Sequence, residues 1–171
     1  YANCLLALDA RTGKLKWHYQ FVHHDIWDRD LPAPPNLLRI QHEGVMVDAV
    51  AQVTKSGFVF VFERETGALL FPVDEVPVPQ SLLPGEVAWP TQPMPRLPAP
   101  FTRQSLEVTD IGLLAPDQAQ LQAIFLSAQT EQFAPFNEGE TVLFPGFDGG
   151  AEWGGAAVDR NGVLYVNANE M

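Results

Sequence analysis

The sequence predicts an all-β fold, built from short strands that tight turns connect. The chain of 171 residues, of which 46% are hydrophobic, is long enough to bury a core without disulfides or metals. Its 15 prolines and 13 glycines favour many strands and turns over long helices. A hairpin-like pattern also recurs along the chain, which indicates that one structural unit is repeated.

The repeated unit is clearest in residues 7–17, which read ALDARTGKLKW. A strand end, a polar turn with Gly13 and the returning aromatic Trp17 are typical of a β-hairpin. Residues 61–71, VFERETGALLF, repeat the acid, the Thr-Gly pair and the aromatic, and residues 157–162 begin a third, truncated copy. A unit of this length is close to a four-stranded propeller blade, which buries its apolar faces mainly against its neighbours.

The other predicted elements follow in chain order. Residues 45–53 and 58–62 are predicted to be two strands, and the turn signal before them is at residues 43–44. Residues 72–100 are rich in proline, so we expect an extended and irregular connection that covers surface without contributing to a hydrogen-bond ladder. Residues 117–129 carry apolar side chains at helical spacing after a proline, and they predict one short helix on the outside.

Together these elements predict a single partial propeller domain over residues 1–171. Its blade units fall roughly at residues 1–20, 21–71 and 140–171, and residues 72–139 form an irregular insertion that contains the short helix. About three blades cannot close a ring and would leave two apolar flanks with unpaired edges. We therefore expect the remaining blades, or other chains, to cover these flanks.

Charge and cysteine content exclude several classes of function. The formal net charge is −11 with only ten lysines and arginines, so binding to a phosphate backbone is not expected. The lone Cys4 can form neither an internal disulfide nor a thiolate metal site. No apolar run is long enough to span a bilayer. The chain starts at Tyr1 without a signal-peptide pattern, and we expect it to be a piece of a longer polypeptide.

The residues that can carry chemistry are concentrated in one block and one lysine. Residues 23–32 read HHDIWDRDLP, and Lys55 follows Asp28 by 27 residues, at the entrance to a predicted strand. Taken alone, an aspartate in a loop is more often a turn former or a cap, and a lysine at a strand end is usually a solvated charge. The combination of the acidic block with a lysine at this spacing is what favours a functional site.

This combination resembles the catalytic stretch of the pyrroloquinoline-quinone (PQQ) dehydrogenases and is most similar to their membrane glucose dehydrogenase branch. Residues 7–17 likewise resemble the family's tryptophan-docking motif, in which the tryptophan of one blade packs against the next. The resemblance extends over nearly all of the chain and implies an eight-bladed β-propeller, of which about three blades are present here. It also implies an enzyme that oxidises a sugar or other alcohol by hydride transfer to the quinone. Residues 30–33 and 90–93 look more like the glucose branch than the methanol branch.

In the resembled family, the acid that follows tryptophan in this block is the general base, which implies this role for Asp28. A carboxylate within hydrogen-bond reach of the alcohol can take its proton as hydride leaves the same carbon. Asp25 is the competing acid in the block. The resemblance also implies that Lys55 contacts the reactive quinone carbonyl, where a fixed ammonium stabilises the negative charge that builds on the oxygen.

Two further candidates for cofactor binding, Trp153 and Gly154, lie in a glycine-rich stretch at residues 144–155. Flexible backbone beside a large aromatic allows close approach of a flat ligand, although a glycine-rich blade turn with a packed tryptophan explains the pattern equally well. The stretch resembles a late-blade segment of the family whose tryptophan approaches the PQQ ring. The family also binds Ca²⁺, for which Asp28 is a candidate ligand, and the other ligands are expected outside this chain.

His23, His24 and Trp27, together with Asp25, are the remaining candidates, for contacts to the substrate or for support of the site. A histidine here can orient a carboxylate, donate to a sugar hydroxyl or merely fill space. A zinc site is rejected, because no further histidine or cysteine lies at ligand spacing.

The resemblance implies a periplasmic enzyme, attached to the membrane, if at all, through segments outside this chain. Its substrate would be a sugar or alcohol, and its electron acceptor a quinone or a cytochrome c. The segment alone is expected to be inactive, because cofactor ligands from other blades are missing. The alternative is a non-catalytic propeller scaffold that binds other proteins, which fold alone does not exclude but which has no reason to hold the pair Asp28 and Lys55.

Overall fold

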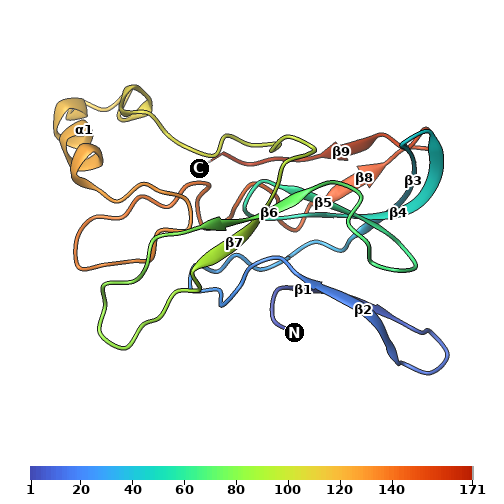
Figure 1. Cartoon of the computed structure of the whole chain (residues 1–171). Coiled ribbons are helices and arrows are strands. Elements are labelled where there is room, and N and C mark those ends of the chain that lie inside the picture. Colours follow the sequence, from blue (N-terminus) through green and yellow to red (C-terminus); the bar gives the residue numbers. More distant parts are fainter. Residues whose placement is uncertain (171) are drawn as a thin grey trace.

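The computed structural model describes residues 1–170, in which nine strands form four antiparallel sheets (Figure 1). The strands are β1 (Cys4–Leu8), β2 (Leu15–Gln20), β3 (Asn36–His42), β4 (Val45–Val53), β5 (Val59–Glu63), β6 (Val73–Pro77), β7 (Thr91–Pro95), β8 (Ala156–Val158) and β9 (Leu164–Val166). One α-helix, α1 (Gln118–Ser127), and one short 3-10 helix (Val108–Asp110) complete the described elements. The all-β prediction is confirmed, and β4, β5 and α1 begin and end within two residues of their predicted positions.

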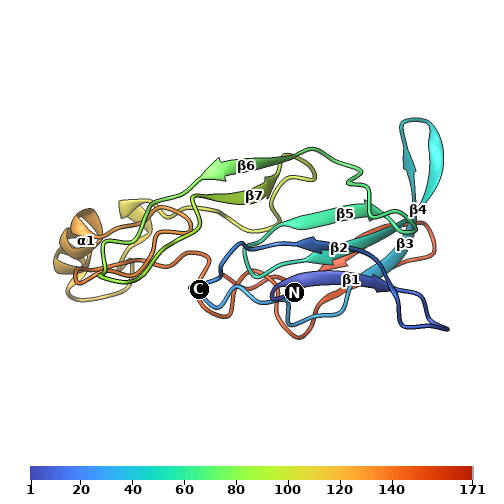
Figure 2. The ribbon, with the colours of Figure 1, turned by 60° about the horizontal axis from the view of Figure 1, so that its bottom comes forward.

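The three-stranded sheet β3–β4–β5 is the centre of the fold, because both of its faces are covered. Successive residues of a strand point to opposite faces. Even-numbered residues of β4 and β5, such as Val50 and Phe60, pack in one core cluster with side chains of the β1–β2 hairpin. Odd-numbered residues, such as Ala51 and Val61, pack in a second cluster with side chains of the β8–β9 hairpin. The result is a stack of three small sheets (Figure 2).

Trp17, at the end of the first repeat, docks onto the second repeat. The centroid of its ring lies 5.7 Å from that of Phe62, and its indole N–H donates to the backbone oxygen of Arg64 at 3.0 Å. A β-carbon added at Gly67 would lie 2.5 Å from the indole, so only glycine lets the ring lie this close to the turn. The docking contact that the resemblance implied is therefore present between these two repeats.

Each repeat contains the same kind of turn, which an acidic side chain organises. The carboxylates of Asp9 and Glu63 each accept two backbone N–H groups and one threonine hydroxyl of their own turn. The carboxylate of Asp159 accepts two backbone N–H groups in the third copy. Hydrogen bonds from these donors lower the pKa of all three carboxyl groups. The first two copies thus share one turn structure, and the third is a turn one residue shorter that an acid organises in a similar way.

The proline-rich region differs from its prediction, because it contains a regular hairpin. β6 and β7 pair in an antiparallel ladder, so the expectation that residues 72–100 contribute no ladder hydrogen bonds is wrong. Hydrogen-bonded and non-hydrogen-bonded pairs alternate along such a ladder. The backbone N–H groups of Val78 and Arg96 donate across the two ends of the hairpin, and this alternation leaves the prolines within the strands at positions where no donor is needed.

The β6–β7 hairpin lies against the loop that follows β2. Gln92, which is fully buried, pairs with the backbone of His23 in that loop. Its side-chain oxygen accepts the His23 N–H and its side-chain nitrogen donates to the His23 oxygen, both at 2.8 Å. The hairpin therefore helps to fix the loop that carries the acidic block.

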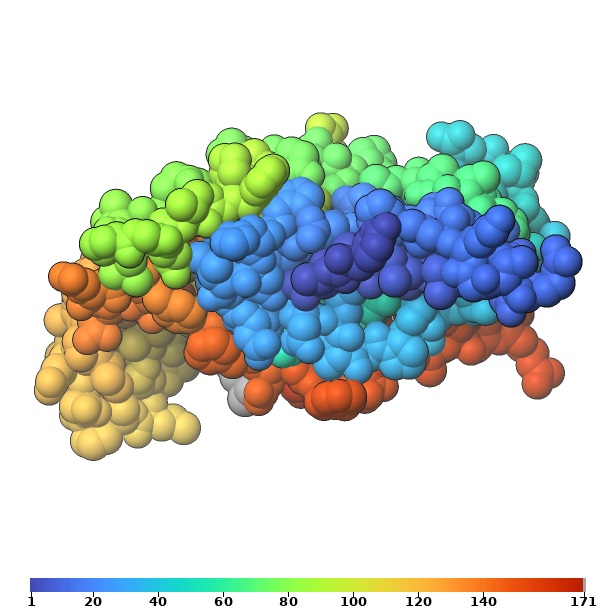
Figure 3. All heavy atoms as spheres, turned by 90° about the horizontal axis from the view of Figure 1, so that it is seen from below, coloured from blue at the N-terminus to red at the C-terminus, as the bar shows by residue number. Residues whose placement is uncertain are grey.

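α1 lies at one end of the molecule, opposite the end formed by the β3–β4 turn (Figures 1 and 2). The side-chain nitrogen of Gln122 donates to the backbone oxygen of Val108 at 3.1 Å and so links the helix to the 3-10 helix. No residue of α1 is buried, and the segment around it forms a lobe beside the stacked sheets (Figure 3). Across residues 1–170, no helix has the length and apolar character needed to cross a membrane.

The four sheets do not by themselves define blades. The assignment of residues 1–20, 21–71 and 140–171 to blade units, with 72–139 as an insertion, stays a prediction, as does the count of eight blades in the whole protein. A division into blades requires sheets that stack on one another and a tryptophan that docks between repeats, and both features are present.

Candidate active site

Lys55 lies in the turn between β4 and β5, directly after the buried end of β4. The N–H of Gly57 donates to the oxygen of Thr54, and the N–H of Thr54 donates to the oxygen of Phe58, both at 3.0 Å. The Thr54 hydroxyl donates to the same Phe58 oxygen at 3.1 Å. These bonds hold the Lys55 backbone at the end of the central sheet, and only 7% of its side chain is exposed.

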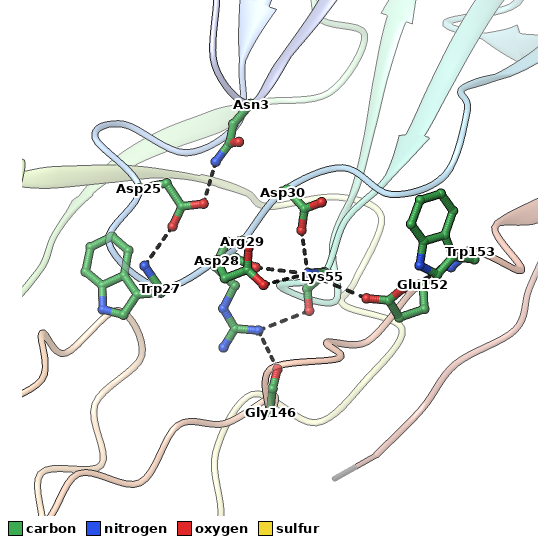
Figure 4. Close-up of polar contacts among 10 residues, drawn as sticks. All are labelled: Asn3, Asp25, Trp27, Asp28, Arg29, Asp30, Lys55, Gly146, Glu152 and Trp153. Carbon is green, nitrogen blue, oxygen red and sulfur yellow. Dashed lines mark hydrogen bonds and ion pairs between the residues drawn. The ribbon is translucent and has the colours of Figure 1, made fainter.

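Three carboxylates surround the buried ammonium of Lys55 (Figure 4). The Nζ atom lies 3.3 Å from Oδ2 of Asp28 and 3.6 Å from Oε1 of Glu152, and it forms an ion pair with Asp30. It also donates to the backbone oxygen of Asp28 at 3.1 Å. The two aspartates come from the loop after β2 and the glutamate from the turn before β8. Three segments that are distant in the sequence therefore meet at one cation.

Burial and the neighbouring acids act on Lys55 in opposite directions. Burial lowers the pKa of Lys55, because the charged form loses hydration. The hydrogen bonds and charges of Asp30, and then those of Asp28, outweigh burial and raise this pKa above its ordinary value. Lys55 is therefore a fixed positive charge at neutral pH.

Two glycines allow the late part of the chain to lie against Lys55. The N–H of Gly150 donates to the backbone oxygen of Lys55 at 2.6 Å. Gly149 has a φ of +72°, and a β-carbon there would lie 2.6 Å from the Cα atom of Lys55, so no larger residue fits. Part of the glycine-rich stretch thus serves as a direct contact to the lysine.

Asp28 is the most exposed of the three acids. Solvent reaches 70% of its side chain, against 50% for Asp30 and 20% for Glu152. Its backbone has a φ of +61°, in the left-handed region that aspartate tolerates better than most residues. The carboxylate reaches both the ammonium of Lys55 and solvent, which is the position that a general base for an incoming hydroxyl requires.

Asp25 and Trp27 lie apart from the ammonium and make structural contacts (Figure 4). One carboxylate oxygen of Asp25 accepts the backbone N–H of Trp27 at 2.9 Å, and the other accepts the side-chain N–H of Asn3 at 2.7 Å. The indole of Trp27 is buried and donates to the backbone oxygen of Ala134 at 2.8 Å. These two residues shape the loop that carries the candidate base.

His23 and His24 both line a shallow hollow beside the loop, together with Trp89 and others. The ring of His23 lies between two side-chain oxygens, with Nδ1 2.9 Å from Gln20 and Nε2 3.0 Å from Glu75. His24 is exposed and has a φ of +43°. In the part of the chain that the structure describes, no hydrogen bond or ion pair joins either histidine to the lysine of the site.

Trp153 and Gly154 follow Glu152 at the open edge of the site. Trp153 is 82% exposed, so within this chain its ring is not packed. Both residues line a hollow with Glu152 and Asn167, and the indole lies on the side of the ammonium away from Asp28 (Figure 4). The exposed ring offers a flat apolar surface next to the acid cluster.

Asp30, Glu152 and Arg29 belong to the site although none of them was among the predicted site residues. Asp30 follows the candidate base Asp28 by two residues in the same acidic block, which is a usable signal. Glu152 adjoins the candidate Trp153. Arg29 is only 2% exposed, yet an arginine between two aspartates is normally solvated, so the sequence carries no sign of its burial.

The acids of the site do not form a metal centre by themselves. Among residues 1–170, no three histidine, cysteine, aspartate or glutamate side chains are arranged to hold a metal ion. Calcium takes about six to eight oxygen ligands. Asp28 and Asp30 are both directed at the ammonium of Lys55. The role of Asp28 as one ligand of a Ca²⁺ ion completed from outside the described residues stays a prediction.

Comparison with known proteins identifies the family of the chain. Over residues 1–171 the chain matches the family described as PQQ: glucose/ethanol/alcohol dehydrogenase, beta-propeller domain. It is 42% identical over 172 residues to the quinoprotein glucose dehydrogenase of Escherichia coli (strain K12), a match that covers 100% of this chain and 22% of that protein. It is 34% identical to the glycerol dehydrogenase large subunit of Gluconobacter oxydans (strain 621H), over 98% of this chain and 23% of that protein.

Among solved structures, the quinohemoprotein alcohol dehydrogenase from Comamonas testosteroni is similar with a TM-score of 0.57 at 23% identity, over 100% of this chain and 20% of that chain. This likeness supports the fold alone. The chain spans about a fifth of the length of the curated relatives that it matches. Because the family matches over residues 1–171, the chain belongs to the β-propeller domain family of the PQQ-dependent glucose, ethanol and alcohol dehydrogenases.

Proposed function

We propose that the full-length protein is a PQQ-dependent dehydrogenase that oxidises a sugar or another alcohol, and that this chain supplies part of its active site. The observation that carries the proposal is the 3.3 Å distance between Nζ of Lys55 and the exposed carboxylate of Asp28. A base and a fixed cation at one place are what alcohol oxidation by a quinone needs from the protein. The relatives named glucose, glycerol and quinate dehydrogenases also support it.

Asp28 acts as the general base in this proposal. Its carboxylate is open to solvent, so the hydroxyl of an alcohol can approach within hydrogen-bond distance and give its proton to a carboxylate oxygen. Asp30 makes the closer ion pair with Lys55 and so holds the ammonium in place. Because Asp30 is the main ion-pair partner of Lys55, the carboxylate of Asp28 remains available to receive the proton.

Lys55 would face the reactive oxygen of the cofactor in this proposal. When PQQ is bound, it supplies the two-electron acceptor that the side chains of this chain lack. Lys55 keeps its proton at neutral pH, because the acids beside it raise its pKa. Its position is fixed before the reaction, so it stabilises developing negative charge without reorganisation. The exposed indole of Trp153 and the backbone of Gly154 line a hollow with Glu152, one of the acids at the ammonium, and offer a surface to a flat ligand.

An aldose is the first substrate to test, because residues 30–33 and 90–93 resemble the glucose branch and a relative at 42% identity is named a glucose dehydrogenase. The electron acceptor is a quinone or a cytochrome c, and the relative named probable quinate dehydrogenase (quinone) supports the first. Asp28 is a ligand of Ca²⁺ that other parts of the protein complete. We place the enzyme in the periplasm on the family resemblance, and cell fractionation tests this location.

A non-catalytic scaffold is the alternative function. A scaffold needs the repeats and the docked Trp17, but it gains nothing from a buried ammonium among three acids. Removing a charge from water costs several kcal/mol unless its partners compensate. The scaffold predicts a full-length protein whose absorbance does not change when PQQ and then a sugar are added.

The test uses the full-length protein reconstituted with PQQ and Ca²⁺, and it compares aldose with primary-alcohol oxidation by dye reduction. Asp28→Asn keeps the shape of the side chain but accepts no proton, so kcat should fall by about 10² to 10⁴-fold while PQQ still binds. Asp117→Asn is the matched control, because this exposed side chain makes no capping hydrogen bond, and it should keep wild-type kcat.

Two results would contradict the proposal. An unimpaired rate in the Asp28→Asn enzyme would remove Asp28 from the mechanism. Failure of the wild-type enzyme to oxidise any sugar or alcohol in the presence of PQQ would reject the proposed function as a whole.

A further inference from the structure

Arg29 is a buried arginine between two acids of the site. Asp28 and Asp30 direct their carboxylates to the ammonium of Lys55, whereas Arg29 between them is only 2% exposed. Burial lowers the pKa of Arg29 to about 10, although the charge of Asp25 acts in the opposite direction. The guanidinium therefore remains charged at neutral pH inside the protein.

The guanidinium binds backbone oxygens of two distant segments (Figure 4). Nη1 donates to the oxygen of Gly146 at 3.1 Å and to that of Lys55 at 3.4 Å, and Nη2 donates to the oxygen of Pro145. Within residues 1–170, Arg29 forms no ion pair with a carboxylate. Carbonyl dipoles take the place of a counter-ion, so the contacts serve to join segments rather than to neutralise a charge.

These contacts hold Lys55 from the end opposite to its ammonium. The backbone oxygen of Lys55 accepts hydrogen bonds from Arg29 and from the N–H of Gly150. The acids at positions 28 and 30 hold the other end of the same residue. Through Gly146, Arg29 also anchors the segment that leads to Glu152, the third acid at the ammonium. One side chain thus connects the base loop, the lysine and the late segment.

We propose that Arg29 is a positioning residue, which fixes Lys55 and residues 145–152 in one arrangement and so sets where the ammonium meets the cofactor. The redox consequence rests on the proposed function, whereas the effect on the placement of Lys55 does not. Arg29 acts through Lys55 and not on the substrate. Because a misplacement of about 1 Å can cost about 10²-fold in rate, loss of these contacts should appear in kcat.

The first test compares Arg29→Lys and Arg29→Met in the full-length holoenzyme. Methionine fills space but removes one donor from each of three carbonyls, and the Pro145 oxygen then keeps no other donor among residues 1–170, whereas those of Lys55 and Gly146 keep the N–H of Gly150 and Gly149. Lysine has one ammonium that cannot bridge both Lys55 and Gly146 in the planar geometry of a guanidinium. We expect kcat to fall about tenfold with lysine and about 10²-fold with methionine, while KM for the sugar changes by less than about twofold. Arg160→Met, at an exposed arginine in the third repeat, is the matched control and should keep wild-type kcat.

A second measurement separates positioning from catalysis. Lys55 is labelled with an amine-reactive ester in the full-length protein without PQQ, and mass spectrometry compares its rate with that of Lys16, which is 45% exposed. The wild-type Lys55, with 7% of its side chain exposed, should react slowly, and both Arg29 variants should increase its rate several-fold relative to Lys16.

The outcomes are distinct for the two proposals. A folded Arg29 variant with wild-type kcat, or with unchanged labelling of Lys55, overturns the positioning role. If the methionine variant does not fold, the lysine variant decides by the same two measurements. Faster labelling of Lys55 in a protein whose wild type oxidises nothing with PQQ would keep the positioning role and reject the proposed function.

Discussion

Carboxylates serve different purposes in two regions of this molecule, the turns of the repeats and the site around Lys55. In the turns, each acid accepts hydrogen bonds from N–H groups within four residues of itself. At the site, three acids from two segments meet the ammonium of a lysine in a third. A turn acid therefore builds local structure, whereas a site acid depends on the stacking of whole sheets.

The lysines show the same contrast. Lys16 pairs with Glu65 at 2.8 Å, and both side chains are largely exposed, so water screens the pair. Lys55 pairs with Asp28 and Asp30 while its own side chain is buried. The comparison indicates that burial of the cation, and not the presence of an ion pair, separates the site from the rest of the surface.

Lys55→Met should lower kcat far more than the same substitution at Lys16. In the full-length enzyme it removes the group proposed to face the quinone and leaves like charges next to each other, so kcat should fall by about 10² to 10³-fold. Lys16→Met removes an exposed pair worth about 0 to 1 kcal/mol and should leave kcat unchanged. Steady-state kinetics of both variants check this prediction, and equal effects would contradict the distinction between the two lysines.

The glycines of the turns provide the second test. Gly13 and Gly67 have φ values of +71° and +76°, so alanine at either position costs about 1 kcal/mol in the backbone. At Gly67 the new β-carbon would also lie 2.5 Å from the indole of Trp17, whereas at Gly13 nothing lies within 4 Å. Gly67→Ala should therefore destabilise the protein by about 1 to 3 kcal/mol more than Gly13→Ala.

Denaturant unfolding of the full-length protein measures this difference. Neither substitution touches the residues around Lys55, so the affinity for PQQ should stay that of the wild type. Equal losses of stability in the two variants would show that the docked tryptophan adds nothing at this interface.

Much of the fold was predictable because it is encoded locally. The β1–β2 hairpin, β4, β5 and α1 follow from patterns within about a dozen residues, and the structure contains them at those places. The proline-rich region misled the prediction, since prolines argue against a ladder in general. A two-stranded ladder needs only every second nitrogen as a donor, and the prolines of β6 and β7 occupy the other positions.

The site was predictable only in part. The spacing of Asp28 and Lys55 identified a pair that the structure brings together. The prediction did not include three other members of the site: Asp30 as the nearer partner, Glu152 as the third acid and Arg29 as the buried link. Their roles depend on how the segment before β8 packs against the central sheet, which is a contact between residues almost one hundred positions apart. No local pattern encodes such a contact.

Asp9→Asn in the first turn should have the smallest effect. Hydrogen bonds from the Thr12 hydroxyl and from backbone N–H groups lower the pKa of the Asp9 carboxyl below its ordinary value. A carboxyl whose pKa is lower in the folded than in the unfolded chain contributes stability that is present above the unfolded pKa and lost as pH falls through the folded pKa. Asparagine carries no charge, so the substitution removes this contribution.

Melting curves of the full-length protein at two pH values test this sign. The melting temperature of the Asp9→Asn variant should lie about one degree below that of the wild type at pH 7, and the difference should shrink in acid as pH falls through the lowered pKa of the folded Asp9 carboxyl. Asp117→Asn, whose side chain caps nothing, should show no difference at either pH. A deficit of Asp9→Asn that persisted in acid would mean that the shape of the acceptor, and not its charge, holds the turn. Turn acids and site acids would then differ only in where their partners lie, and the charge of a turn acid would not matter for stability.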